Sequence, residues 1–114
     1  MTQIIVIGGG PAGMMAALSA AEAGADVTLL ERNDRLGKKL RITGKGRCNV
    51  CNDCEPEAVI RAVPENGKFL YGALMRFTPR DVMDFFEQHG VPLKTERGRR
   101  VFPCSDKAQD IVDA

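Results

Sequence analysis

The stretch that decides the fold is Ile4-Ile5-Val6-Ile7-Gly8-Gly9-Gly10-Pro11-Ala12-Gly13, near the start of a 114-residue chain. Its apolar run, closed by glycines, is typical of a strand buried on both faces of a parallel sheet. Proline is favoured at the first position of a helix, and good helix formers continue from there until Gly24 ends the pattern. Val27 to Leu30 is predicted as a second buried strand. Together these segments predict a βαβ unit.

The glycine spacing, Gly8-x-Gly10-x-x-Gly13, is the fingerprint of a dinucleotide-binding turn. The first glycine permits the tight turn, the second lets the backbone approach a pyrophosphate, and the third allows close helix–strand packing. The phosphates would lie at the helix N-terminus, where unpaired N–H groups favour negative charge. Glu31 ends the second strand at nearly the expected spacing of about 20 residues, so its carboxylate can accept hydrogen bonds from ribose hydroxyls. A glycine-rich turn beside a merely solvated glutamate is the alternative.

A long irregular segment follows, from Arg32 to Cys54, without periodicity. A loop of this length is usually functional or disordered. Its charge is mostly positive, which suits the two phosphates of a dinucleotide. A solvated loop and a nucleic-acid patch are alternatives, although no aromatic platform for bases is interleaved. The seven basic residues are Arg32, Arg35, Lys38, Lys39, Arg41, Lys45 and Arg47.

The second half of the chain is predicted to contain short helices and a β-hairpin. Thr78, followed by Pro79 and by Asp81 at the third helical position, is a helix start signal. Ser105 is expected to cap a last helix that begins at Asp106. The other predicted elements are helices at 55–62 and 69–76, and a hairpin of 93–95 and 100–102 turning at Arg97-Gly98.

Composition places the chain among globular proteins, since 44% of its residues are hydrophobic and its net charge is +1. That charge gives no general attraction to nucleic acid or membrane. The first apolar run is too short for a membrane span or a secretory signal, so we expect a cytoplasmic protein. About four strands are predicted, whereas a doubly wound sheet needs five or six. The pattern at 111–114 is that of an unfinished helix, so we expect an N-terminal piece of a longer protein and an incomplete domain.

Several motifs together resemble the BaiN/RdsA-like family of FAD/NAD(P)-dependent flavoprotein oxidoreductases. The resemblance runs through nearly the whole chain. It implies an α/β, Rossmann-like FAD-binding unit of the glutathione-reductase type, with 1–54 as the first cofactor segment and 55–114 continuing toward a substrate domain. The motifs are Ile7–Gly13, Leu30-Glu31-Arg32, Leu36–Leu40, Thr43–Asn49, Gly98–Pro103 and Ser105–Ala108.

The resemblance also implies an activity: FAD reduced by NAD(P)H passes electrons to an organic acceptor. It implies a small-molecule substrate, and it assigns no catalytic acid or base within these residues. An NAD-binding dehydrogenase and a non-catalytic dinucleotide sensor are the alternatives. The residues expected to bind the cofactor are Gly8, Gly10, Pro11, Ala12, Gly13, Glu31, Arg32, Lys38, Lys39, Thr43, Gly44, Arg47 and Asn49.

Cysteines recur at Cys48, Cys51 and Cys54, the spacing of the first three ligands of a ferredoxin-type cluster. Ala58 stands where a fourth ligand is expected, and a zinc site lacks the same ligand. A redox-active pair is a third interpretation, and incidental thiols are favoured. Lys45 and Arg47 could raise the thiolate fraction of Cys48, although packing is favoured for it. The family resemblance leads us to expect Thr rather than Cys at position 51.

Overall fold

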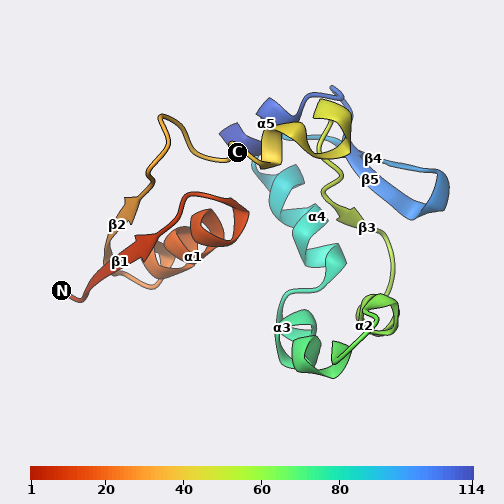
Figure 1. The fold of residues 1–114 in the computed structure, drawn as a ribbon, viewed down its shortest axis with the longest axis horizontal. Coiled ribbons are helices and arrows are strands. Elements are labelled where there is room, and N and C mark those ends of the chain that lie inside the picture. Colours follow the sequence, from red (N-terminus) through yellow and green to blue (C-terminus); the bar gives the residue numbers. More distant parts are fainter. The chain divides into compact units, whose positions relative to one another are not determined.

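The computed structural model describes residues 1–114, which form two compact units, Met1–Ile42 and Thr43–Ala114 (Figure 1). The division falls inside the predicted basic loop. The division predicted from the sequence, into residues 1–54 and 55–114, describes which parts of the chain contribute to the cofactor domain and not which parts are compact. That division stays a prediction.

The first unit is the predicted βαβ unit. Strand β1 (Gln3–Ile7) and strand β2 (Asp26–Leu30) are parallel, with Ile5 opposite Thr28, and helix α1 (Pro11–Glu22) connects them. Gly24 follows the helix with a φ of 89°, the left-handed conformation expected after a helix end. The predicted α/β, Rossmann-like fold is therefore confirmed in this unit.

Burial of the two strands differs from the prediction. Both strands were expected to be buried on both faces, but exposed and half-buried residues alternate along each. Ile5, Ile7 and Leu30 are 66%, 85% and 51% exposed. The reason is that one helix can cover only one face of a two-stranded sheet. The apolar run therefore records two apolar faces, of which this chain covers one.

The second unit contains four short α-helices, together with 3₁₀ turns, around a small sheet. The antiparallel sheet has the order β3-β5-β4, with Thr95 of β4 opposite Val101 of β5. Its strands are β3 (Cys51–Asn52), β4 (Leu93–Glu96) and β5 (Arg100–Pro103). Its helices are α2 (Pro56–Ala62), α3 (Tyr71–Arg76), α4 (Pro79–Gln88) and α5 (Ala108–Asp113), and 3₁₀ turns cover Leu40–Gly46, Gly67–Leu70 and Arg97–Arg99.

The core of this unit gathers around the central strand β5. Val101, Phe102 and Pro103 of that strand are buried, and Met83 of α4 and Ile111 of α5 are buried as well. Because β5 pairs with both other strands, it brings together chain segments that are distant in sequence.

Most of the elements predicted in the second half are confirmed, including the hairpin and the helix start at Thr78. The Thr78 hydroxyl accepts a hydrogen bond from the Asp81 N–H at 3.1 Å, and the Asp81 carboxylate accepts one from the Thr78 N–H at 2.9 Å. This reciprocal arrangement is a capping box. The short strand β3 was not predicted, because a two-residue strand has no periodicity to detect.

The predicted start of the last helix is wrong. Helix α5 begins at Ala108 rather than at Asp106, and its N-cap residue is Lys107, without a side-chain cap. Ser105 instead accepts a hydrogen bond from the Lys107 N–H at 3.2 Å. Asp106 has a φ of 58° and belongs to a turn, where its carboxylate binds Lys94 and Arg47. None of the helices is both long enough and apolar enough to span a membrane.

Candidate dinucleotide-binding site

The glycine turn joins β1 to α1 in the geometry that the fingerprint predicts. The Gly8 N–H donates to the Leu30 carbonyl at 2.8 Å, which ties the turn to the end of β2. A Cβ at Gly13 would lie 1.7 Å from the Gly8 carbonyl oxygen, so only glycine permits this approach of helix and turn. A Cβ at Gly10, in contrast, would meet nothing within 4 Å. The space in front of Gly10 is therefore open to a ligand.

The N-terminus of α1 presents free donors to the same space. The first helical hydrogen bond runs from the Met14 N–H to the Gly10 carbonyl at 2.9 Å. The N–H groups of Ala12 and Gly13 precede it and have no intrahelical acceptor, and Pro11 has no N–H. No side chain caps this end, so the helix dipole is available to an anion.

Glu31 is bound to the glycine turn. One carboxylate oxygen accepts from the Gly9 N–H at 2.9 Å, and the other accepts from the Asn33 N–H at 2.7 Å. These backbone hydrogen bonds, from Asn33 first and then Gly9, hold the pKa of Glu31 below its ordinary value. The carboxylate therefore stays ionised at neutral pH, and its remaining lone pairs can accept hydrogen bonds from a ribose.

Sequence reasoning missed the role of Gly9, which lies between the fingerprint glycines. A Cβ there would approach the Leu36 side chain to 2.4 Å and the Glu31 Cβ to 3.2 Å. The Gly9 carbonyl also accepts a hydrogen bond from the Gly37 N–H at 2.8 Å. Gly9 therefore joins the turn to both Glu31 and the start of the basic segment. The sequence signal for this role was the run of three consecutive glycines, in which Gly9 lies between the two fingerprint positions Gly8 and Gly10.

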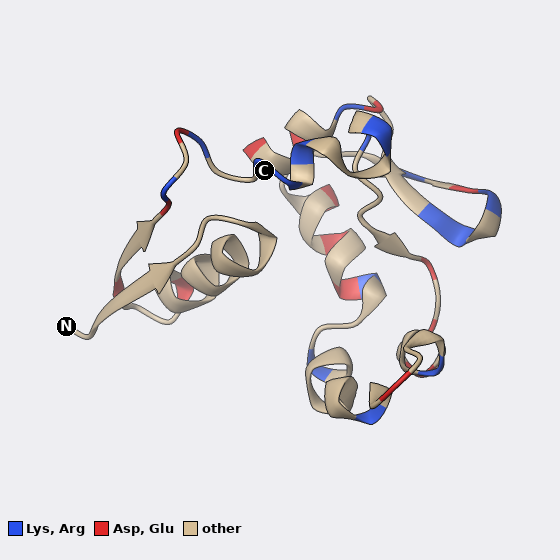
Figure 2. Ribbon diagram, viewed as in Figure 1, with Lys and Arg blue, Asp and Glu red and all other residues tan.

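Lys and Arg residues occur along the connection after β2 and in the hairpin β4–β5, among other places (Figure 2). In the first unit, Arg32, Lys38 and Lys39 are exposed, and Lys38 and Lys39 make no ion pair. These cations are thus available to an anionic ligand. The structure brings Glu31 and the glycine turn together. The three cations Arg32, Lys38 and Lys39 follow Glu31 in the sequence and lie at the surface.

The other predicted residues lie in a tight loop, Thr43–Asn49, which we call the cofactor loop. Its backbone curls through left-handed conformations at Gly44, Lys45, Gly46 and Cys48. The Cys48 N–H donates to the Thr43 carbonyl at 3.1 Å, which closes the curl. A Cβ at Gly44 would lie 2.8 Å from the amide nitrogen of Asn49, so the loop is closed in a shape that requires glycine there.

Comparison with known proteins decides the family. A model described as the HI0933-like protein Rossmann domain matches residues 2–114. The chain belongs to this family. It is 38% identical over 96% of its length to the ribosomal RNA dihydrouridine synthase of Escherichia coli. It is 34% identical over 99% of its length to the 3-dehydro-bile acid delta(4,6)-reductase of Clostridium scindens. It spans 26% and 27% of those two proteins.

Shorter matches cover only part of this HI0933-like domain. An NADH oxidase of Thermoanaerobacter brockii is 50% identical over 40 residues, which is 35% of the chain. The predicted membership of the BaiN/RdsA-like flavoprotein family is thus confirmed. The glycine turn and Glu31 belong to a Rossmann domain, and the second half of the chain belongs to the same family match.

The cysteines of the domain are all free thiols. Burial raises the pKa of Cys48, although a hydrogen bond from Thr43 opposes this, and it raises the pKa of Cys51 to about 11. Cys48 is 1% exposed, which agrees with the packing role favoured from the sequence, and neither Lys45 nor Arg47 is among the causes of its pKa shift. The structure gathers no three metal-ligating side chains in one place. The raised pKa values favour incidental thiols, since the thiolate is the reactive form.

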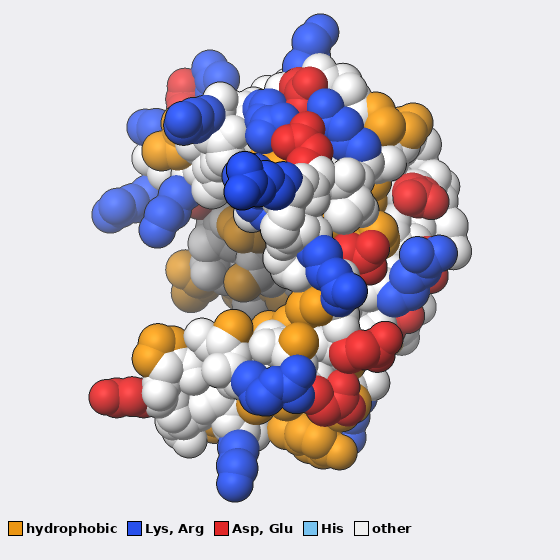
Figure 3. Space-filling view, turned by 90° about the vertical axis from the view of Figure 1, so that its right-hand side faces the viewer, with side chains coloured by type: hydrophobic (Ala, Val, Ile, Leu, Met, Phe, Trp, Pro, Cys, Tyr) orange, Lys and Arg blue, Asp and Glu red, His pale blue; other side chains and the backbone are white.

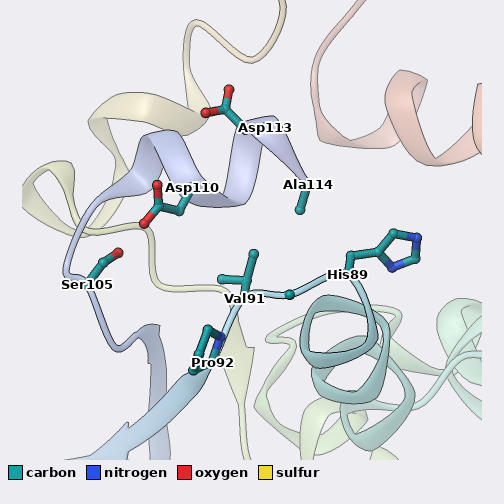
Figure 4. A pocket seen from close by; sticks show the side chains of 8 residues that line it. His89, Val91, Pro92, Ser105, Asp110, Asp113 and Ala114 are labelled. Atoms are coloured by element: carbon teal, nitrogen blue, oxygen red, sulfur yellow. The ribbon is translucent and has the colours of Figure 1, made fainter.

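A separate hollow of about 370 Å³ lies between the end of α4 and helix α5. The His89 ring is turned away from Asp110 and Asp113, and its Nδ1 lies 2.7 Å from the Phe85 carbonyl oxygen (Figure 4). The hollow therefore holds no converging set of catalytic groups. Its lining residues are His89, Gly90, Val91, Pro92, Ser105, Asp110, Asp113 and Ala114.

Proposed function

We propose that this chain is the nucleotide-binding part of an FAD-dependent oxidoreductase that is reduced by NAD(P)H and passes electrons to an organic acceptor. One arrangement carries the proposal: the uncapped N-terminus of α1 faces the open space at Gly10, and ionised Glu31 is bound to the same glycine turn. An anionic pyrophosphate with a ribose beside it fits both groups.

The residues present fit FAD. The glycine turn and helix start would hold the pyrophosphate through their N–H groups, and Glu31 would hold the adenosine ribose. The exposed cations would offset the two phosphate charges. Bound FAD would supply the electron-transfer chemistry, and the protein would supply binding and orientation. The residues that we propose as contacts are Gly8, Gly10, Pro11, Ala12, Gly13, Glu31, Arg32, Lys38, Lys39, Thr43, Gly44 and Asn49. Arg47, which the sequence also predicts to bind the cofactor, lies in the same loop as Thr43, Gly44 and Asn49 and is not among these proposed contacts.

Glu31 favours an unphosphorylated adenosine ribose, because a 2′-phosphate would bring a second negative group against the carboxylate. This suits FAD and NAD alike. The family supports FAD, since the two relatives matched along the whole chain are flavoprotein family members. An NAD-dependent dehydrogenase is the second candidate, and a sensor that binds a dinucleotide without turnover is the third.

The visible spectrum of the complete gene product tests the proposal. A yellow protein that releases one equivalent of FAD on denaturation is expected, with bleaching by NADH or NADPH under anaerobic conditions. A colourless protein that binds NAD would favour the dehydrogenase. For the acceptor we propose a small molecule rather than a nucleic acid or a membrane component. Two relatives are named as ribosomal RNA dihydrouridine synthases, so reoxidation by structured RNA is the contrary outcome to look for.

A further inference from the structure

Arg47 of the cofactor loop is held by acidic groups on two other segments. Its guanidinium lies 3.0 to 3.2 Å from both Glu96 carboxylate oxygens and 3.1 Å from an Asp106 oxygen. Lys94 binds the same two acids, at 3.3 Å from Glu96 and 2.8 Å from Asp106. Two cations and two anions thus form one closed cluster. Figure 3 shows acidic side chains directly beside basic ones on the face of the second unit that it views.

The cluster lies over the core of the second unit. The guanidinium carbon of Arg47 is 3.8 Å from the ring centre of Phe102, which is 2% exposed. A Cβ at Gly44 would lie 3.2 Å from an edge carbon of the same ring. The cofactor loop therefore packs on Phe102 at two points, and its Cys48 side chain is 1% exposed. Arg47 connects this packing to Glu96 of β4 and to the turn at Asp106.

The charge balance of the cluster argues against a direct phosphate contact by Arg47. Two positive and two negative groups sum to zero, so the cluster offers little attraction to a pyrophosphate. Lys45, in the same loop, is exposed and makes no ion pair. The ion pair with Glu96 also fixes the orientation of the Arg47 guanidinium, because a bidentate guanidinium–carboxylate contact restricts rotation of the group.

We propose that Arg47 is a positioning residue: Glu96, Asp106 and Phe102 hold its guanidinium and thereby hold the Thr43–Asn49 loop in the shape in which it meets FAD. The inference rests on the proposed function and deepens it, because it separates residues that touch the cofactor from residues that shape its loop. Glu96 and Asp106 become determinants of FAD binding without contacting it.

A double-mutant cycle in the complete gene product tests the proposal. The variants are Arg47→Met, Glu96→Gln and their combination, with Arg97→Gln as a control that removes an exposed arginine from the same hairpin. FAD affinity is measured by fluorescence titration of the apoprotein. We expect each single variant to weaken FAD roughly threefold to fivefold, the size typical of a partly exposed ion pair, and the double variant to lose no more. The control should bind as the parent protein does.

A second measurement reports on the loop without FAD. Peptide-mapped alkylation of the apoprotein follows Cys48, which is buried when the loop is closed. We expect faster alkylation of Cys48 in Arg47→Met and in Glu96→Gln, at unchanged rates for exposed Cys104. The Cys48 alkylation rate therefore reports on the loop independently of FAD binding. A parent protein without FAD would defeat the proposed function, and accelerated Cys48 alkylation would still support the positioning role.

Opposite results would overturn the proposal. If Arg47 contacted the phosphates directly, Glu96→Gln would free its charge and tighten FAD binding or leave it unchanged, while Arg47→Met alone weakened it. Losses that add in the double variant would show that the two residues act independently. Unchanged Cys48 alkylation in both variants would show that the cluster does not hold the loop.

Discussion

Substituting the fingerprint glycines separates folding from cofactor binding, because the structure surrounds them differently. A Cβ at Gly13 would lie 1.7 Å from the Gly8 carbonyl oxygen, and Cβ atoms essentially never lie within 3.0 Å of such a non-bonded atom. In Gly13→Ala the start of α1 must therefore move by more than 1 Å from β1. Overpacking of this kind costs about 1–3 kcal/mol, offset in part by the better helix propensity of alanine, worth up to about 1 kcal/mol.

Gly10→Ala is the matched variant. Its Cβ meets nothing within 4 Å, and Gly10 has an ordinary φ of −80°, so the free energy of unfolding should stay within about 0.5 kcal/mol of the parent value. If the pyrophosphate lies against Gly10, the added methyl group occupies its place and FAD binding is lost. We therefore expect Gly13→Ala to be destabilised and to bind FAD poorly, and Gly10→Ala to be as stable as the parent protein and to bind FAD poorly.

Urea unfolding and FAD titration of the two variants measure both quantities. Gly72→Ala serves as a control, because Gly72 lies in helix α3 with open space around it and should gain up to about 1 kcal/mol. A stable Gly10→Ala protein with parental FAD affinity would refute the reasoning. It would mean that the phosphates lie away from the glycine turn.

Further predictions concern other parts of the chain. Glu31→Ala should weaken FAD roughly 10-fold; equal retention of FAD in both proteins would remove the ribose assignment. Because the pKa of folded Glu31 lies below 4.5, its contribution to stability is present above pH 4.5 and is lost as the pH falls through the folded pKa. In urea unfolding at pH 7 and pH 4, the free energy of unfolding of Glu31→Gln should therefore change less between the two pH values than that of the parent protein. Thr78→Ala should cost about 1 kcal/mol in urea unfolding, because it removes half of the capping box. Anaerobically purified protein should contain no stoichiometric iron or zinc by elemental analysis, and several irons with sulfide would restore the cluster interpretation of the cysteines. The 114-residue chain alone should lose FAD on gel filtration, since one face of β1 and β2 lies exposed; a fragment that keeps one equivalent and melts cooperatively would contradict this.

The local parts of the fold could be predicted from sequence because their signals are local. The glycine spacing, Pro11, Gly24 and the Thr78–Asp81 capping box each act within a few residues, and each has the predicted geometry. Burial could not be predicted in this way. An apolar run shows that a strand has apolar faces, whereas Ile5 and Ile7 show that covering both faces depends on elements that are not neighbours in sequence.

The last helix shows how a distant contact overrides a local signal. Ser105-Asp106 resembles a helix start, and the serine does accept a backbone hydrogen bond. The structure turns the chain at Asp106 instead, with a φ of 58°, and α5 begins two residues later. The Asp106 carboxylate binds Lys94 and Arg47, which lie 12 and 59 residues away in sequence. The residues next to Asp106 in the sequence do not include Lys94 or Arg47, so local sequence signals could not place the start of this helix correctly.

The same distance explains why the role of Arg47 could not be read from the basic loop. In sequence, seven cations between Arg32 and Arg47 are equivalent candidates for phosphate binding. In the structure they fall into two kinds, because Glu96 and Asp106 neutralise Arg47 while Lys38 and Lys39 stay unpaired at the surface. We therefore propose that a positively charged loop next to a dinucleotide fingerprint combines two tasks. In this proposal Lys38 and Lys39 meet the ligand, and Arg47 holds its loop against the hairpin.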